Sequence, residues 1–93
     1  MYPSLRYFIS NGDALRPALA AFDLIVANLL STLLIDLAPT LVGALAPGGR
    51  VIASGILSIE AQGVLQAFAA HKLVERARIA DGEWLTFDFA LSP

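Results

Sequence analysis

Short polar side chains follow three apolar, strand-like runs in this sequence, close to the point where each run ends. Asp13 comes soon after residues 5–10, Asn28 comes directly after 24–27, and the pair Ser54–Gly55 follows 51–53. The carboxyl ends of parallel strands meet at one edge of an open sheet, where α/β proteins bind their ligands. The Asn28 carboxamide can donate and accept hydrogen bonds at once, which suits an amine or an amino-acid moiety. The pattern predicts a small-molecule site at this edge.

Each of these positions also has a structural interpretation. Asp13 fits equally well as the N-cap of a helix over 14–21, where its carboxylate would accept backbone hydrogen bonds. Asn28 fits a turn or cap before the next helix, and Ser54–Gly55 is typical of a turn at the end of a strand. Ligand contact is favoured for Asn28, because an asparagine that ends a buried strand is costly to bury without hydrogen-bond partners.

Other kinds of chemistry find no support in the sequence. Residues 52–56 lack the Gly-x-Ser-x-Gly pattern of a serine-hydrolase elbow. A single histidine, His71, and no cysteine leave no set of ligands typical of a metal site. The pair Gly48–Gly49 follows a helical pattern and precedes a strand, which is the reverse of the order in a phosphate-binding loop. We therefore predict neither a catalytic triad nor a metal ion.

Strand-like and helical patterns alternate along most of the chain. The predicted strands cover residues 5–10, 24–27, 51–53, 73–79 and 83–91, and the predicted helices cover 14–21, 31–45 and 60–71. Pro39 is expected to kink or split the middle helix, and Asp81–Gly82 predicts a hairpin between the last two strands. Strands separated by helices imply parallel pairing with right-handed crossovers. The predicted fold is an α/β sandwich with a mostly parallel five-stranded sheet and one antiparallel strand from the C-terminal hairpin.

The composition of the chain restricts the classes of protein to which it can belong. The chain has 93 residues, of which 57% are hydrophobic and 15% charged, so we expect one folded domain over 1–93 rather than disorder. A net charge of −2 predicts no nucleic-acid partner.

The sequence also bears on the location of the protein. Residues 24–49 carry one charge, but prolines and glycines divide them into runs too short to span a membrane. With no signal peptide predicted either, a cytoplasmic location is expected. The high apolar fraction implies that both faces of the sheet are covered or that the chain has a partner surface.

Residues 22–30, Phe-Asp-Leu-Ile-Val-Ala-Asn-Leu-Leu, resemble the fourth-strand motif of class I S-adenosylmethionine-dependent methyltransferases. The narrower resemblance is to the PrmA family, the enzymes that methylate protein eleven of the large ribosomal subunit. Further matches follow in the same order at residues 37–39, 45–50, 54–57 and 83–84.

The resemblance implies a cofactor, a substrate and three binding residues. Asn28, followed by Leu29, would contact the methionine part of S-adenosylmethionine beside the target amine, and Asp13 would lie by the adenine. The substrate would be a ribosomal protein. No acid–base residue is implied, because alignment of the amine, methyl and sulfonium supplies most of the rate effect in an in-line displacement.

The sequence also departs from the family pattern. Nothing in residues 1–12 resembles the glycine-rich cofactor loop or the acidic residue that holds the ribose. We therefore expect the C-terminal half of a methyltransferase fold that is inactive alone. The alternative is a non-enzymatic interaction or dimerisation module on a degenerate methyltransferase fold, and exposure of Asn28 would favour the first interpretation.

The departure also bears on strand pairing. Two strands of the family are missing between residues 5–10 and 24–27, which would leave the apolar edge Leu24–Ala27 unpaired. Either 5–10 pairs directly with that edge, giving the strand order 1-2-3-5-4, or two chains associate there as a homo-oligomer.

Overall fold

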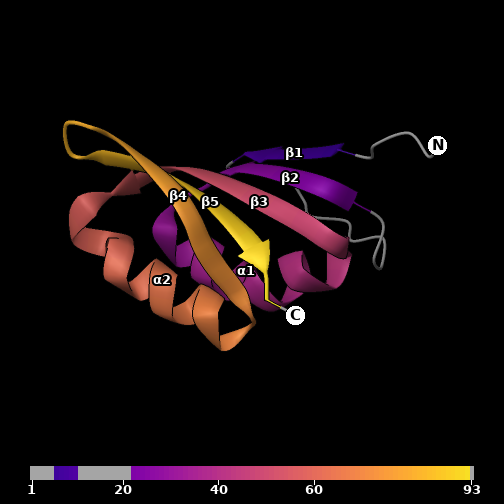
Figure 1. Ribbon diagram of the computed structural model, residues 1–93. Helices are drawn as coiled ribbons and strands as arrows, with labels where there is room; N and C mark the ends of the chain where they lie inside the picture. The colour runs from indigo at the N-terminus through magenta and orange to yellow at the C-terminus, as the bar shows by residue number, and fades with distance from the viewer. Residues whose placement is uncertain (1–5, 11–21, 93) are drawn as a thin grey trace.

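A computed structural model of the chain describes residues 6–10 and 22–92 (Figure 1). The strands are β1 (Arg6–Ser10), β2 (Phe22–Asn28), β3 (Leu45–Leu57), β4 (Leu73–Asp81) and β5 (Trp84–Leu91). The helices are α1 (Ser31–Ala44), the short 3₁₀ helix η1 (Ser58–Glu60) and α2 (Ala61–Ala70). The helix predicted over 14–21 and the candidate residue Asp13 lie outside the described residues.

The five strands form one sheet in the order β1-β2-β3-β5-β4, as predicted. The pairs β1–β2 and β2–β3 are parallel, whereas β3–β5 and β4–β5 are antiparallel. The expectation of a mostly parallel sheet is therefore only partly right. Four strands share one direction, but the returning strand β5 lies between two of them and makes both of its pairings antiparallel.

Strand β2 has neighbours on both sides. Its partner β1 pairs with it from Arg6↔Leu24 to Ser10↔Asn28, and β3 pairs with its other edge. Direct pairing of the first strand is thus confirmed. The predicted homo-oligomer through the edge Leu24–Ala27 is not supported, because β1 already occupies that edge within the chain.

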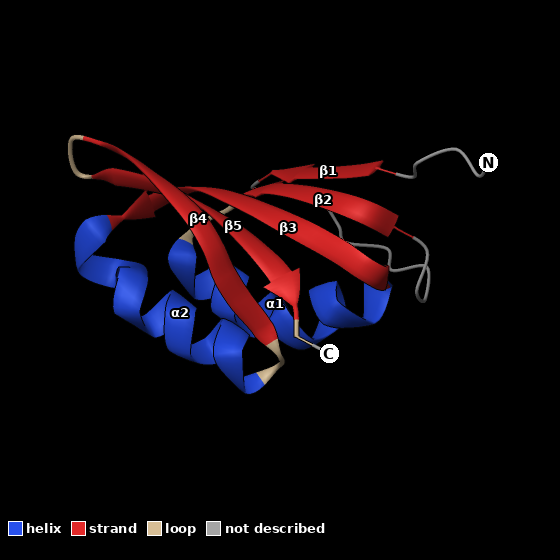
Figure 2. Ribbon diagram, viewed as in Figure 1, coloured by secondary structure: helices blue, strands red, loops and turns tan. Residues whose placement is uncertain are grey.

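Helices α1 and α2 pack on the same face of the sheet, which we call the covered face (Figure 2). The side chains between helices and sheet are fully buried, among them Leu34, Leu41, Val64 and Phe68 from the helices and Ile25, Ala27, Val51, Ala53, Phe87 and Phe89 from the strands. The rings of Phe68 and Phe89 lie 4.5 Å apart between centroids. These contacts join α2 to β5 and make this layer the core.

Helix α1 continues through Pro39 as one helix of 14 residues, so the predicted split does not occur. Pro39 is exposed. The proline removes one backbone hydrogen bond from the helix, while the nearby Ala38 and Leu41 are fully buried in the core. None of the described helices is long and apolar enough to cross a membrane.

The opposite face, called here the uncovered face, carries no helix among the described residues (Figure 2). Its side chains alternate along the strands with those of the covered face and include Phe8, Val26, Ile52, Ile79, Thr86 and Asp88. Phe8 and Ile79 are 68% and 71% exposed. Apolar side chains therefore lie on both faces, although the described helices cover only one.

Candidate functional site at the carboxyl edge of the sheet

Three polar residues form a row across the parallel part of the sheet. Ser10, Asn28 and Ser54 are successive register partners on β1, β2 and β3. Ser10 and Asn28 end their strands, so the row lies at the carboxyl edge. The predicted convergence of Asn28 and Ser54 is confirmed by this register. Ser10 takes the place in this register at the end of the first strand, where the sequence suggested Asp13.

Asn28 lies between residues of the chain whose side chains are buried. Ile25 and Ala27 are fully buried on one side of it, and Leu29, which is 1% exposed, follows on the other. Asn28 itself is exposed. No residue in the described part of the chain is hydrogen-bonded to its carboxamide. Leu29, the second predicted contact, can offer a ligand little but its backbone.

Gly55 lies directly against the Asn28 side chain. A Cβ atom built on Gly55 would stand 2.6 Å from Asn28 Oδ1, which is closer than two such atoms can approach. The glycine has φ +77°, a conformation that L side chains rarely adopt. The left-handed backbone favours glycine at this position, and a Cβ there would also displace the end of the Asn28 side chain. The sequence alone indicated only the turn.

A polar contact joins the two helices near this edge. The hydroxyl of Ser31, in the first turn of α1, donates to Glu60 Oε1 over 3.1 Å. Ser31 is only 5% exposed, and Glu60 ends η1 immediately before α2 begins. The contact links the first turn of α1, three residues after Asn28, to the end of η1. Sequence reasoning missed this pair, since its members lie 29 residues apart.

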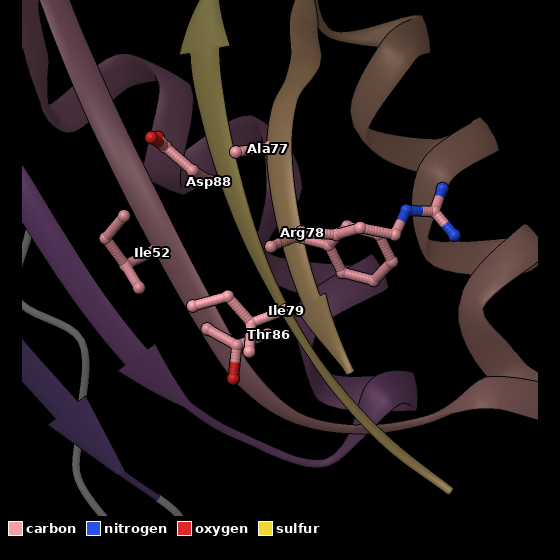
Figure 3. Close-up of a pocket in the computed structure, with 7 residues that line it drawn as sticks. Ile52, Ala77, Arg78, Ile79, Thr86 and Asp88 are labelled. Atoms are coloured by element: carbon pink, nitrogen blue, oxygen red, sulfur yellow. The ribbon is translucent and has the colours of Figure 1, made fainter. Parts of the chain in front are cut away.

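The uncovered face has a hollow of its own, with a volume of about 210 Å³. Figure 3 shows Ile52, Ile79 and Thr86 near one another on strands β3, β4 and β5, whereas the Arg78 guanidinium points away from them. Asp88 also lines the hollow and forms an ion pair with Arg50 on the same face. The hydrogen bond from Arg50 to Asp88 raises the pKa of this guanidinium above its ordinary value. The lining is mostly apolar, and it does not include Asn28.

The sheet topology places the chain in a class, since it matches part of a methyltransferase fold. A methyltransferase from Pyrococcus furiosus superimposes with a TM-score of 0.65 over 82% of this chain at 14% identity, covering 44% of that protein. The T. thermophilus 16S rRNA methyltransferase RsmC, solved with AdoMet and guanosine, gives a TM-score of 0.61 at 18% identity, over 83% of this chain and 22% of RsmC. At these identities the likeness shows the fold alone.

The family follows from closer matches. The family model of the ribosomal protein L11 methyltransferase (PrmA) matches residues 7–91, so the chain belongs to this family. The ribosomal protein L11 methylase of Lactobacillus delbrueckii subsp. bulgaricus has a TM-score of 0.75 and 34% identity, over 78% of this chain and 38% of that one.

Curated relatives agree with the family model. The ribosomal protein L11 methyltransferase of Chloroflexus aurantiacus is 48% identical over 66 residues, which are 71% of this chain and 20% of the relative. That of Agrobacterium fabrum is 49% identical over 65 residues, which are 70% of this chain and 22% of the relative. The chain thus spans about a fifth of the length of the curated relatives it matches.

Proposed function

We propose that this chain forms part of an S-adenosylmethionine-dependent protein methyltransferase site and that Asn28 is its cofactor-contacting residue. The observation that carries the proposal is the exposed Asn28 carboxamide, without a hydrogen-bond partner among the described residues, at the carboxyl edge of a PrmA-family sheet. This is the edge at which open α/β sheets bind ligands.

The donor and acceptor atoms of Asn28 fit the methionine part of the cofactor. The amide N–H₂ can donate to a carboxylate, and the carbonyl oxygen can accept from an ammonium group or from the target amine. S-adenosylmethionine supplies a methyl group activated on a sulfonium. Asn28 would orient its partners for an in-line transfer, in which positioning provides most of the acceleration. Asp13, which lies outside the described residues, and the backbone of Leu29 complete the proposed contacts.

The proposed acceptor is an amino group of a ribosomal protein, because the relatives are ribosomal protein L11 methyltransferases. A cytoplasmic location belongs to this proposal, because ribosomal proteins are found there. We also propose that the chain does not methylate by itself. Its seven glycines include no Gly-x-Gly stretch that could approach the cofactor closely.

A chimera tests the proposed function. Residues 7–91 replace the corresponding segment of the Chloroflexus aurantiacus relative, and transfer of labelled methyl groups to ribosomal protein L11 is measured. We expect transfer by the chimera and a loss of roughly 100-fold in kcat/KM with Asn28→Ala, as for a lost positioning contact. Gln66→Ala is the matched control, since it removes an exposed carboxamide from α2. Full activity of a folded Asn28→Ala chimera would contradict the proposal.

The uncovered face favours a second candidate function, which is self-association of two copies through this apolar surface. Phe8 and Ile79 are its most exposed apolar side chains among the described residues. Sedimentation velocity over a range of protein concentrations distinguishes the outcomes. A dimer that dissociates with the double variant Phe8→Ser/Ile79→Ser would support an interaction module, whereas a monomer at every concentration would remove this candidate.

A further inference from the structure

Two glycines share the same unusual backbone conformation but differ in their surroundings. Gly48 has φ +78° and Gly55 has φ +77°. A Cβ on Gly48 would meet no atom within 4 Å, so its turn explains that glycine completely. A Cβ on Gly55 would meet Asn28 Oδ1 at 2.6 Å and Cγ at 3.8 Å. The choice of residue at position 55 is therefore constrained twice, by the backbone conformation and by the neighbouring Asn28 side chain.

A β-bulge creates this contact. The pairing of β3 with β5 passes from Ala53↔Phe87 to Ile56↔Leu85, so Ser54 and Gly55 together lie opposite a single residue of β5. Such a bulge bends the strand and changes the direction of nearby groups. Here it brings the backbone of residue 55 against the side chain of residue 28.

The bulge cannot move away easily. Ala53 before it and Ile56 after it are both fully buried. On the β2 side, Asn28 is the register partner of Ser54 and is followed by the buried Leu29. A rigid surface without a side chain thus lies beside a carboxamide whose polar atoms are otherwise unrestrained by the described residues.

We propose that Gly55 is a positioning residue, whose bare backbone sets the orientation of the Asn28 carboxamide toward a ligand at the carboxyl edge. This inference rests on the proposed function for the identity of the ligand, an amino-acid moiety with an amine beside it. A methyl group at residue 55 must turn the carboxamide, which would leave Asn28 present but misdirected. In this proposal Gly55 has no side chain that contacts the ligand and acts only through the orientation of Asn28.

A double-mutant cycle on the full chain tests the contact without any ligand. Gly55→Ala is compared with Gly48→Ala, which introduces the same backbone strain into open space. We expect Gly55→Ala to lower the urea midpoint more than Gly48→Ala does. In the Asn28→Ala background, the loss caused by Gly55→Ala should shrink to that of the control. Equal losses in both backgrounds would overturn the proposal, and the cycle remains readable if the single variant is partly unfolded.

Side-chain NMR separates positioning from simple strain. The chain has only two asparagines, so the Asn28 side-chain amide signals can be assigned readily. Gly55→Ala should shift them and change the χ1 couplings of Asn28, while Gly48→Ala leaves them unchanged. Unchanged Asn28 couplings in folded Gly55→Ala would contradict the proposal.

Titration with S-adenosylmethionine then provides the functional measurement. We expect Gly55→Ala to weaken the shifts at Asn28 at least tenfold in ligand concentration, with Gly48→Ala matching the unmodified chain. If the unmodified chain shows no shifts while the cycle shows coupling, the proposed function fails and Gly55 is a structural residue only.

Discussion

The two faces of the sheet are built from alternate residues of the same strands, yet they differ in what covers them. On the covered face, Ile25 and Val51 have no exposed surface. Their immediate neighbours Val26 and Ile52 belong to the uncovered face and are only half-buried. The side chains are chemically alike, so the difference lies in the helices and not in the strands.

The difference between the two faces accounts for the many apolar residues in the strands. A run such as Leu24–Ala27, without polar alternation, is typical of a strand with both faces buried. The described helices bury one face, and the residues suited to a second layer remain at the surface. Apolar side chains on both faces of the sheet contribute to the 57% hydrophobic content of the chain.

Truncation of a phenylalanine gives the largest expected contrast between the faces. Phe68→Ala removes a fully buried ring that contacts Phe89, and we expect a loss of about 3–5 kcal/mol in the free energy of unfolding. Phe8→Ala, on the uncovered face, should change it by no more than about 0.5 kcal/mol. Urea denaturation measures both. Similar losses would mean that the uncovered face is packed in solution.

A matched pair of isoleucines gives a smaller contrast. Ile25 on β2 is fully buried on the covered face, and Ile52 on β3 lies half-buried on the uncovered face. We expect Ile25→Ala to cost about 2–5 kcal/mol and Ile52→Ala less than about 2 kcal/mol, because little cavity forms at an open surface. The same urea experiment applies, and a greater loss from Ile52→Ala would break the comparison.

The smallest expected effect concerns the ion pair Glu75–Arg78 on β4. Hydrogen bonds from Arg78 to Glu75 lower the pKa of this carboxyl below its ordinary value of 4.5. Its stabilising contribution is therefore complete above pH 4.5 and disappears as the pH falls through the lower pKa of the folded state. Exposed ion pairs contribute little to stability. The urea midpoint of the unmodified chain should fall between pH 5 and pH 3, and in Glu75→Gln this fall should be only slightly smaller. A carboxyl titration of Glu75 by NMR with a midpoint above 4.5 would disagree with this geometry.

Local patterns were sufficient to predict most strands and the position of Asn28, whereas the strand order was predicted from the resemblance to the methyltransferase family. The hairpin was also predicted, although its turn lies at Gly82–Glu83, one residue later than expected. Strand β3 runs from Leu45 to Leu57, far beyond the predicted 51–53. Its first part pairs with β2 through an irregularity near Phe22, and a turn-like Pro-Gly-Gly sequence gives no indication of that pairing.

The missed features of the site depend on pairings between distant segments. The contact of Gly55 with Asn28 requires a bulge in β3 that exists only relative to β5. The Ser31–Glu60 hydrogen bond requires the packing of α1 beside α2. Sequence patterns indicate which residue types end a strand, but the register that brings them together is set by tertiary structure.

The central claim is that the carboxyl edge of this sheet retains part of a cofactor site, and titration of S-adenosylmethionine into the ¹⁵N-labelled chain tests it most directly. We predict weak, saturable shifts confined to Asp13, Asn28 and Leu29, with S-adenosylhomocysteine giving the same pattern and Asn28→Ala abolishing it. No shift at Asn28 at millimolar ligand, or equal shifts over both faces of the sheet, would contradict the account.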